Sequence, residues 1–192
     1  MVEKLVVATG NPGKLEEIQE YLMELPWKLE LKPAEIDVDE TETSFIANAR
    51  LKASEVAKAV GKWSIADDSG LAVDALNGAP GIYSARYGNT DKNRIDRLLK
   101  ELSNIDNRQA KFICAIAIAN PNGKIVLETE GRCHGEILKS PRGSNGFGYD
   151  PIFYVPSQRQ TFAEMSSKTK SQISHRGVAF KQIMPELKKL NL

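Results

Sequence analysis

The sequence lacks the features that would direct a chain to a membrane or to an oxidising compartment. Its two cysteines, Cys114 and Cys133, form no CxxC pair and are too few for a disulfide scaffold. The longest purely apolar run, Phe112 to Ala119, is too short to span a bilayer. Glu3 and Lys4 interrupt the apolar start that a signal peptide needs. We therefore expect a cytoplasmic protein with reduced thiols and no membrane partner.

An excess of one charge is also lacking. The 26 Lys and Arg residues are balanced by 25 Asp and Glu residues, so the formal net charge is +1. A chain with this balance has no general attraction to the phosphate backbone of a nucleic acid. Hydrophobic residues make up 41% and charged residues 27%, as is typical of globular chains. We predict a single domain over residues 1–192 with no nucleic-acid partner.

The most informative feature that is present is a pair of adjacent acids, Asp67 and Asp68. They follow an apolar run, residues 63–66, that predicts a buried strand, and Gly70 predicts the end of that strand. The pair should then lie at a strand's carboxyl end, where open α/β sheets bind ligands. Neighbouring strand residues point to opposite faces, so one aspartate would reach a given pocket unless a turn brings both round. Such carboxylates suit Mg²⁺ or the activation of a water, although a polar capped turn has the same composition.

A small polar loop near the start of the chain is a second candidate. Residues 4–8 predict a strand and residues 9–14 a tight loop, and a helix with an apolar face at Leu15, Ile18 and Leu22 follows. A loop between strand and helix turns backbone N–H groups toward an anion. The spacing is not that of a P-loop, so both a phosphate site and an ordinary polar loop remain open.

An acidic loop and a helix lie between these two features. The loop, residues 35–42, is either a solvated surface or the source of a carboxylate for a metal. The helix, about residues 44–60, carries Asn48 and Lys52 on one face because they are four residues apart. That polar face is either exposed or part of a site.

The C-terminal half adds an aromatic segment and a basic cluster. Residues 109–119 and 124–135 predict a hairpin around the turn at residues 120–123. In residues 142–153, glycines flank Phe147, which could lie against a ligand ring. Three basic residues follow: Lys170, His175 and Arg176. A nucleoside phosphate with a bound metal would suit the combination of an aromatic group, cations, a candidate phosphate-binding loop and paired acids. The residues therefore indicate a nucleotide-binding α/β enzyme.

Six segments keep one order over nearly the whole chain: residues 8–14, 45–49, 66–71, 78–87, 146–153 and 174–177. In this order they closely resemble the inosine triphosphate pyrophosphatase family, also described as the dITP/XTP pyrophosphatases. The resemblance implies an α/β fold with an elongated mixed β-sheet flanked by helices, in two lobes with a substrate cleft between them. It also implies a homodimer.

The same resemblance implies an activity and assigns residues to it. The reaction would be Mg²⁺-dependent hydrolysis of a purine nucleoside triphosphate (ITP, dITP or XTP) to the monophosphate and pyrophosphate, which removes such nucleotides from the pool. Asp68 would be the proton acceptor near the metal, supported by Asp67, and Glu40 would help to bind Mg²⁺. The residues expected to hold the triphosphate are Thr9, Gly10, Asn11, Pro12, Gly13, Lys14 and Lys52, and Ser69 would touch the substrate. Those expected around the nucleoside are Phe147, Gly148, Tyr149, Asp150, Lys170, His175 and Arg176.

Base selectivity is expected to come from hydrogen-bond donors. Arg176 has only donors, so it would bond the keto oxygen of hypoxanthine or xanthine and reject the amino group of adenine. Two alternatives stay open. The first is a Maf-like pyrophosphatase for pyrimidine or modified nucleotides, against which the segment at residues 174–176 argues. The second is a nucleotide sensor without activity, against which the acid pair argues.

Overall fold

A seven-stranded mixed sheet organises the chain, as expected for an α/β protein. The structure is a computed structural model and describes residues 4–23 and 25–190. The strand order is β2-β1-β3-β4-β5-β6-β7. β1 pairs in parallel with β2 and β3, and β6 pairs antiparallel with β5 and β7. The strands are β1 (Lys4–Val7), β2 (Lys28–Leu31), β3 (Trp63–Val73), β4 (Gln109–Ala119), β5 (Ile125–Ile137), β6 (Phe153–Val155) and β7 (Gln160–Thr161).

Five α-helices accompany these strands in the described part of the chain. They are α1 (Pro12–Leu22), α2 (Phe45–Val60), α3 (Asp91–Glu101), α4 (Ser167–Ile173) and α5 (His175–Leu187). The chain forms two compact units. The first contains residues up to Asp68, Cys114–Gly131 and the chain from Arg176 on, and the second contains Ser69–Ile113 and Arg132–His175. One pyrophosphatase domain with a cleft between lobes stays a prediction.

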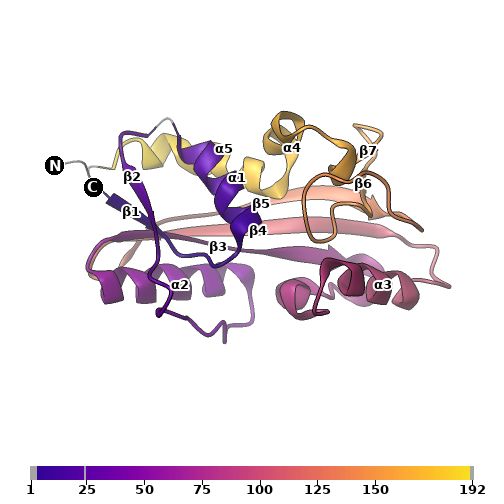
Figure 1. Cartoon of the computed structure of the whole chain (residues 1–192), viewed down its shortest axis with the longest axis horizontal. Helices are drawn as coiled ribbons and strands as arrows, with labels where there is room; N and C mark the ends of the chain where they lie inside the picture. The colour runs from indigo at the N-terminus through magenta and orange to yellow at the C-terminus, as the bar shows by residue number, and fades with distance from the viewer. Residues whose placement is uncertain (1–3, 24, 191–192) are drawn as a thin grey trace. The chain divides into compact units, whose positions relative to one another are not determined.

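In the first unit, helices cover both faces of the strands. Figure 1 shows α1 and α5 on one side of β1 and β3, and α2 on the other. Ile18 and Phe180 bring the apolar faces of α1 and α5 into one buried cluster with these strands. α2 matches the expected helix: the Ser44 side chain accepts the Ala47 N–H at its start, and Gly61, with φ of 63°, ends it. The helix therefore holds its polar residues in a fixed position beside β3.

The second unit has an aromatic core. Phe112, Phe153 and Phe162 are buried, and their ring centroids lie 4.7–5.7 Å apart. Leu98 and Leu102, from α3 and the residue that ends it, join the same cluster. Tightly packed rings of this kind provide a rigid support for any side chain that stacks on them.

The strand that carries the acid pair does not end at Gly70. β3 continues to Val73, so the prediction that Asp67 and Asp68 lie at its carboxyl end is wrong. The reason is that Leu71 and Val73 are fully buried and continue the apolar strand, which the local glycine signal does not reveal. The neighbour β1 does end here, since its last residue Val7 pairs with Ile65. The acids therefore lie just beyond the carboxyl end of β1, the kind of edge at which parallel strands bind ligands.

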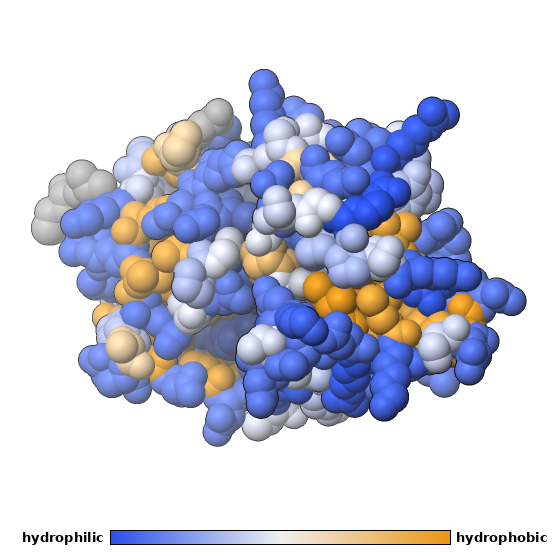
Figure 2. Space-filling view, turned by 45° about the vertical axis from the view of Figure 1, so that its right-hand side comes forward, coloured by the Kyte–Doolittle hydropathy of each residue, from blue (hydrophilic) through white to orange (hydrophobic). Residues whose placement is uncertain are grey.

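The surface seen in Figure 2 is mostly hydrophilic, with hydrophobic residues in separate groups. Large hydrophobic side chains that are well exposed include Met23, Leu31 and Tyr83. Among the described residues, no helix has the length and apolar character that crossing a membrane requires.

Candidate active site

The loop after β1 forms the capped start of a helix. The Asn11 side chain accepts the backbone N–H of Lys14 at 3.2 Å, and the Thr9 hydroxyl accepts the backbone N–H of Asn11 at 3.2 Å. Pro12, which has no N–H to lose, is the first residue of α1. The predicted loop is thus held in shape by its own polar groups, and the positive end of an 11-residue helix lies at the end of β1.

Asp67 is surrounded by cations. Its Oδ2 atom lies 3.0 Å from Nη2 of Arg176 and 3.2 Å from Nζ of Lys14, and its side chain is 1% exposed. Burial tends to raise the pKa of this carboxyl, but Lys14, Arg176 and Lys52 outweigh burial and hold the pKa well below its usual range. Asp67 is therefore an ionised residue whose carboxylate is strongly held.

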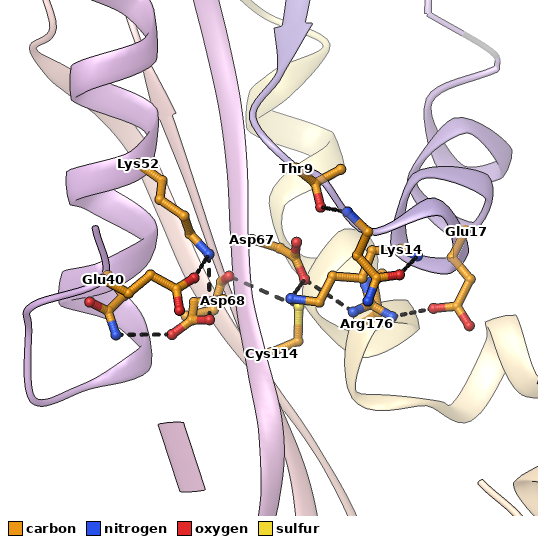
Figure 3. A network of polar contacts seen from close by, with 12 residues as sticks. Thr9, Lys14, Glu17, Glu40, Lys52, Asp67, Asp68, Cys114 and Arg176 are labelled. Carbon is orange, nitrogen blue, oxygen red and sulfur yellow. Dashed lines mark hydrogen bonds and ion pairs between the residues drawn. The ribbon is translucent and has the colours of Figure 1, made fainter. Parts of the chain in front are cut away.

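Arg176 connects Asp67 to α1. Its guanidinium is buried and also donates to the carboxylate of Glu17 on that helix. Burial would lower the pKa of Arg176, yet the charges around it, including those of Asp67 and Glu17, raise it. Figure 3 shows Lys14, Arg176 and Glu17 together on one side of the strand. This side of the acid pair is a charged network centred on Asp67.

Asp68 faces the other side of the strand, toward α2 (Figure 3). Its Oδ2 atom accepts from Nδ2 of Asn48 at 3.2 Å, and its Oδ1 atom lies 3.4 Å from Nζ of Lys52. Burial raises the pKa of Asp68; Lys52 and Lys14 oppose this rise, while Glu40 and Asp67 add to it. A carboxylate with a raised pKa in a confined place is suited to accept a proton from water.

Lys52 bridges Asp68 and the acidic loop. Its ammonium donates to Oε1 of Glu40 at 2.6 Å. Burial would lower the pKa of Lys52, but the carboxylates of Asp68, Asp67 and Glu40 outweigh it, so the pKa is raised and the ammonium stays charged. Two carboxylates thus converge on one positive charge.

That pair of carboxylates also fits a divalent cation. Within residues 4–23 and 25–190, no group of three or more His, Cys, Asp or Glu side chains is placed to hold a metal. Mg²⁺ commonly takes one or two protein carboxylates and completes its shell with water and substrate phosphates. Glu40 and Asp68, which already share a cation in Lys52, provide such a donor set.

In the second unit, Asp150 organises the aromatic segment. Its Oδ2 atom accepts from Nζ of Lys170 at 2.7 Å and from the backbone N–H of Phe147 at 2.9 Å. The Lys170 ammonium lies 5.0 Å from the centroid of the Phe147 ring and 5.6 Å from that of Phe162. These contacts place a cation beside an aromatic face.

His175 belongs to the same unit and is held by stacking. Its ring is buried, lies 4.7 Å from the ring of Phe112 at an angle of 14°, and is also stacked on Phe162.

Two further contacts anchor the segment at residues 147–150. The backbone N–H of Gly148 donates to Asp91 at 2.7 Å, and the Tyr149 hydroxyl donates to a backbone carbonyl, that of Ser84, at 3.0 Å.

The structure thus groups most of the predicted residues into two sets. One set, in the first unit, contains the loop at residues 9–14, Glu40, Lys52 and Asp68. The other, in the second unit, contains residues 147–150, Lys170 and His175, and Ser69 lies partly buried on β3 there. Arg176 lies in the first unit, where it binds Asp67 and Glu17, and its place around the nucleoside stays a prediction.

Sequence reasoning missed several residues that shape these sets. Glu17 and Asp91 look like ordinary helix-surface acids, and Phe112 and Phe162 look like core residues. The two acids act through partners that are distant in sequence: Glu17 and Arg176 are 159 positions apart, and Asp91 and Gly148 are 57 apart. The position of Asn48 four residues before Lys52 was a usable signal, but it did not distinguish a site from an exposed polar face.

Comparisons with known proteins agree over nearly the whole chain. Residues 5–186 match the Ham1 family. A dITP/XTP pyrophosphatase from a Nostoc species is 61% identical over 187 residues, which cover 97% of this chain and 95% of that protein. One from a Synechocystis species is 61% identical over 180 residues, 94% of this chain and 93% of that protein. The solved structure of a HAM1 protein from Coxiella burnetii is 43% identical, with a TM-score of 0.90 over 98% of this chain and 100% of that one.

Proposed function

The chain belongs to the Ham1 family, and we propose that it hydrolyses ITP, dITP and XTP to the nucleoside monophosphate and pyrophosphate. Relatives that are 61% identical over more than nine-tenths of the chain are named dITP/XTP pyrophosphatases. The observation that carries the proposal is Asp68, a buried carboxylate with a raised pKa that shares the Lys52 ammonium with Glu40. Its proposed role is to orient a water molecule and take its proton.

The first set of residues suits the triphosphate. A triphosphate carries about four negative charges, and water attacks it slowly unless these are offset. Lys14, Lys52 and the N-terminus of α1 provide positive charge in one unit of the chain. Asp68 then needs only to accept a proton, which contributes a factor of about 10²–10⁴ to the rate.

We assign the metal ligands to Glu40 and Asp68, with Mg²⁺ as the metal. When bound, Mg²⁺ neutralises charge on the phosphate oxygens. The protein's own contribution is to hold both carboxylates at one place through the Lys52 ammonium, Glu40 at 2.6 Å and Asp68 at 3.4 Å.

The second set suits a purine. We propose that the base stacks on Phe147 and that Lys170 and His175 present donors to its edge. Lys170 has three donors and no acceptor, so it bonds a keto oxygen and meets an adenine amino group donor to donor. For Arg176, which binds Asp67 and Glu17, we propose a role beside Asp67.

Two further properties belong to the same proposal. Because the reaction acts on free nucleotides, we place the protein in the cytoplasm. We also propose a homodimer, since Tyr83, at 58% exposure, lies in an apolar and aromatic segment that would favour burial against a second copy. Sedimentation at micromolar concentration should show a species of twice the 21.2 kDa chain mass, and a single species at the chain mass would contradict the dimer.

The decisive measurement is release of pyrophosphate from a panel of triphosphates in the presence of Mg²⁺. We expect kcat/KM for ITP, dITP and XTP to exceed that for GTP, with ATP weak and CTP weaker. Asp68→Asn should lower turnover by at least about 100-fold with the fold intact. Asp106→Asn, the same change at an exposed loop position, is the matched control.

The alternatives give different results in the same assay. A preference for pyrimidine or modified nucleotides would favour a Maf-like pyrophosphatase. Tight nucleotide binding without release of pyrophosphate would favour a sensor. Either result would contradict the proposed function.

A further inference from the structure

Asn48 on α2 is a buried polar side chain that the proposed chemistry does not use. It is 1% exposed, although asparagine side chains are usually exposed. Its carboxamide oxygen accepts the backbone N–H of Glu42 at 3.0 Å. Its carboxamide nitrogen donates to Oδ2 of Asp68 at 3.2 Å and lies 3.5 Å from the backbone oxygen of Glu42. One side chain thus contacts both the acidic loop and the proposed catalytic carboxylate.

The orientation of this carboxamide follows from its partners. A backbone N–H can only donate, so it requires the oxygen end, and an ionised carboxylate can only accept, so it requires the nitrogen end. Turning the group over would place oxygen against oxygen at Asp68 and donor against donor at Glu42. Because the carboxamide is planar, the bond to Glu42 also fixes the direction in which Asn48 donates to Asp68.

Asn48 and Lys52 act on different oxygens of Asp68. Asn48 donates to Oδ2, and Lys52 lies 3.4 Å from Oδ1. The two residues are one helical turn apart on α2, so a single rigid element holds both ends of the carboxylate. The close view in Figure 3 shows α2 and Glu40 on the same side of the strand as Asp68.

These contacts, together with the backbone from Glu40 through Thr41 to Glu42, form a closed ring. Asn48 binds the backbone of Glu42 and the side chain of Asp68, Lys52 binds Asp68 and Glu40, and Glu40 is two residues from Glu42 in the same loop. A closed ring restricts both carboxylates more than separate bonds would, since moving one requires a change in the others.

We infer that Asn48 is a positioning residue for the reaction: it sets the orientation of the Asp68 carboxylate and fixes the acidic loop beside it. The inference rests on the proposed role of Asp68 as the proton acceptor. A plain structural role, in which Asn48 merely anchors the loop, predicts a loss of stability but no dependence on Asp68.

A double-mutant cycle separates these two roles. Asn48→Ala should lower kcat for ITP by about 10–100-fold, the usual effect of removing a residue that orients a ligand or catalytic group, with KM changed less than about threefold. In an Asp68→Asn background the same change should cost less than about threefold, because no carboxylate remains to be oriented. Asn104→Ala, the same substitution at an exposed position, should leave kcat unchanged in both backgrounds.

If Asn48→Ala lowered kcat by the same factor in both backgrounds, the inference about Asn48 would be overturned, while the proposed role of Asp68 would stand. Near wild-type turnover of Asp68→Asn would instead contradict the proposed role of Asp68, so the two failures are distinguishable. Thermal unfolding of each variant shows whether the kinetic loss comes from unfolding.

A second measurement needs no Asn48 variant and no activity. In protein labelled with ¹⁵N-asparagine and free of metal and substrate, the side-chain N–H₂ signals of Asn48 report the bond to Asp68. We expect them to shift in Asp68→Ala and to stay unchanged in Asp106→Ala. Identical Asn48 signals in the wild type and in Asp68→Ala would overturn the inference even if Asn48→Ala does not fold.

Discussion

Asp67 and Asp68 are adjacent and chemically identical, yet the same substitution should change a different property of the protein at each position. Asp67→Asn removes the charge that faces Arg176, whose side chain is 1% exposed, while the ion pair between Arg176 and Glu17 remains. Asp68→Asn removes a charge that burial already disfavours, as its raised pKa indicates. We therefore expect Asp67→Asn to act on stability and Asp68→Asn to act on turnover.

The magnitudes follow from the two environments. Removing one partner of a buried ion pair destabilises a fold by about 3–5 kcal/mol, and the bond that Glu17 keeps places Asp67→Asn near the lower end. For a chain of this size, each kcal/mol lowers Tm by about 2–4 °C, so we expect a fall of about 6–12 °C. Asp68→Asn loses a long contact with Lys52, 3.4 Å, but also removes a charge that burial disfavours. Because the two effects oppose each other, its stability should change by about 1 kcal/mol or less.

Thermal unfolding and pyrophosphate release are measured on both variants at one pH and one protein concentration. Asp68→Asn should have a Tm within a few degrees of wild type, about the effect of 1 kcal/mol, and at least about a 100-fold loss of kcat. The reasoning is refuted if Asp67→Asn has a wild-type Tm, or if Asp68→Asn is the less stable of the two.

Three further outcomes are expected. Glu40→Gln should raise the Mg²⁺ concentration needed for the half-maximal rate. Glu42→Gln, the same change at an exposed position of the same loop, should leave that concentration unchanged. Equal effects of the two substitutions in a metal titration would contradict the assignment of Glu40 as a ligand. Lys170→Met should reduce the ITP:ATP ratio of kcat/KM by about 10–100-fold because it removes a charged donor. Lys168→Met, at an exposed position, is the control. An unchanged ratio in Lys170→Met would show that Lys170 does not select the base. The depressed pKa of Asp67 contributes stability above the unfolded-state pKa of about 4, and this contribution is lost as the pH falls below it. The Tm gap between wild type and Asp67→Asn should therefore narrow below about pH 4, and a gap of constant size from pH 7 to pH 2 would count against the ion pair.

Local patterns predicted the elements of the fold well where the pattern itself decides the structure. The helix at residues 44–60 has apolar residues at helical spacing and a serine cap, and α2 runs from Phe45 to Val60. The hairpin has two apolar runs around a turn at residues 120–123, and β4 and β5 flank that turn. In both cases the information lies within a few residues of the element.

The sequence could not reveal features that depend on distant partners. Gly70 looked like a break because strand pairing and burial, which carry β3 on to Val73, come from other parts of the chain. The sequence shows Arg176 next to His175, but it does not reveal that Arg176 binds Asp67 and Glu17. The partner of Arg176, Asp67, is 109 residues away, and no local periodicity encodes that distance.

The difference between the two aspartates finally depends on the strand that carries them. Neighbouring side chains on a strand point to opposite faces, so Asp67 meets Lys14 and Arg176 while Asp68 meets α2. Two cations in direct contact lower one pKa, whereas burial, with Glu40 adding to it, raises the other. Two carboxyl groups with divergent pKa values can divide the work, one as a fixed charge and one as a proton acceptor. Continuation of β3 through the pair, rather than a turn that would bring both acids to one side, is what makes this division possible.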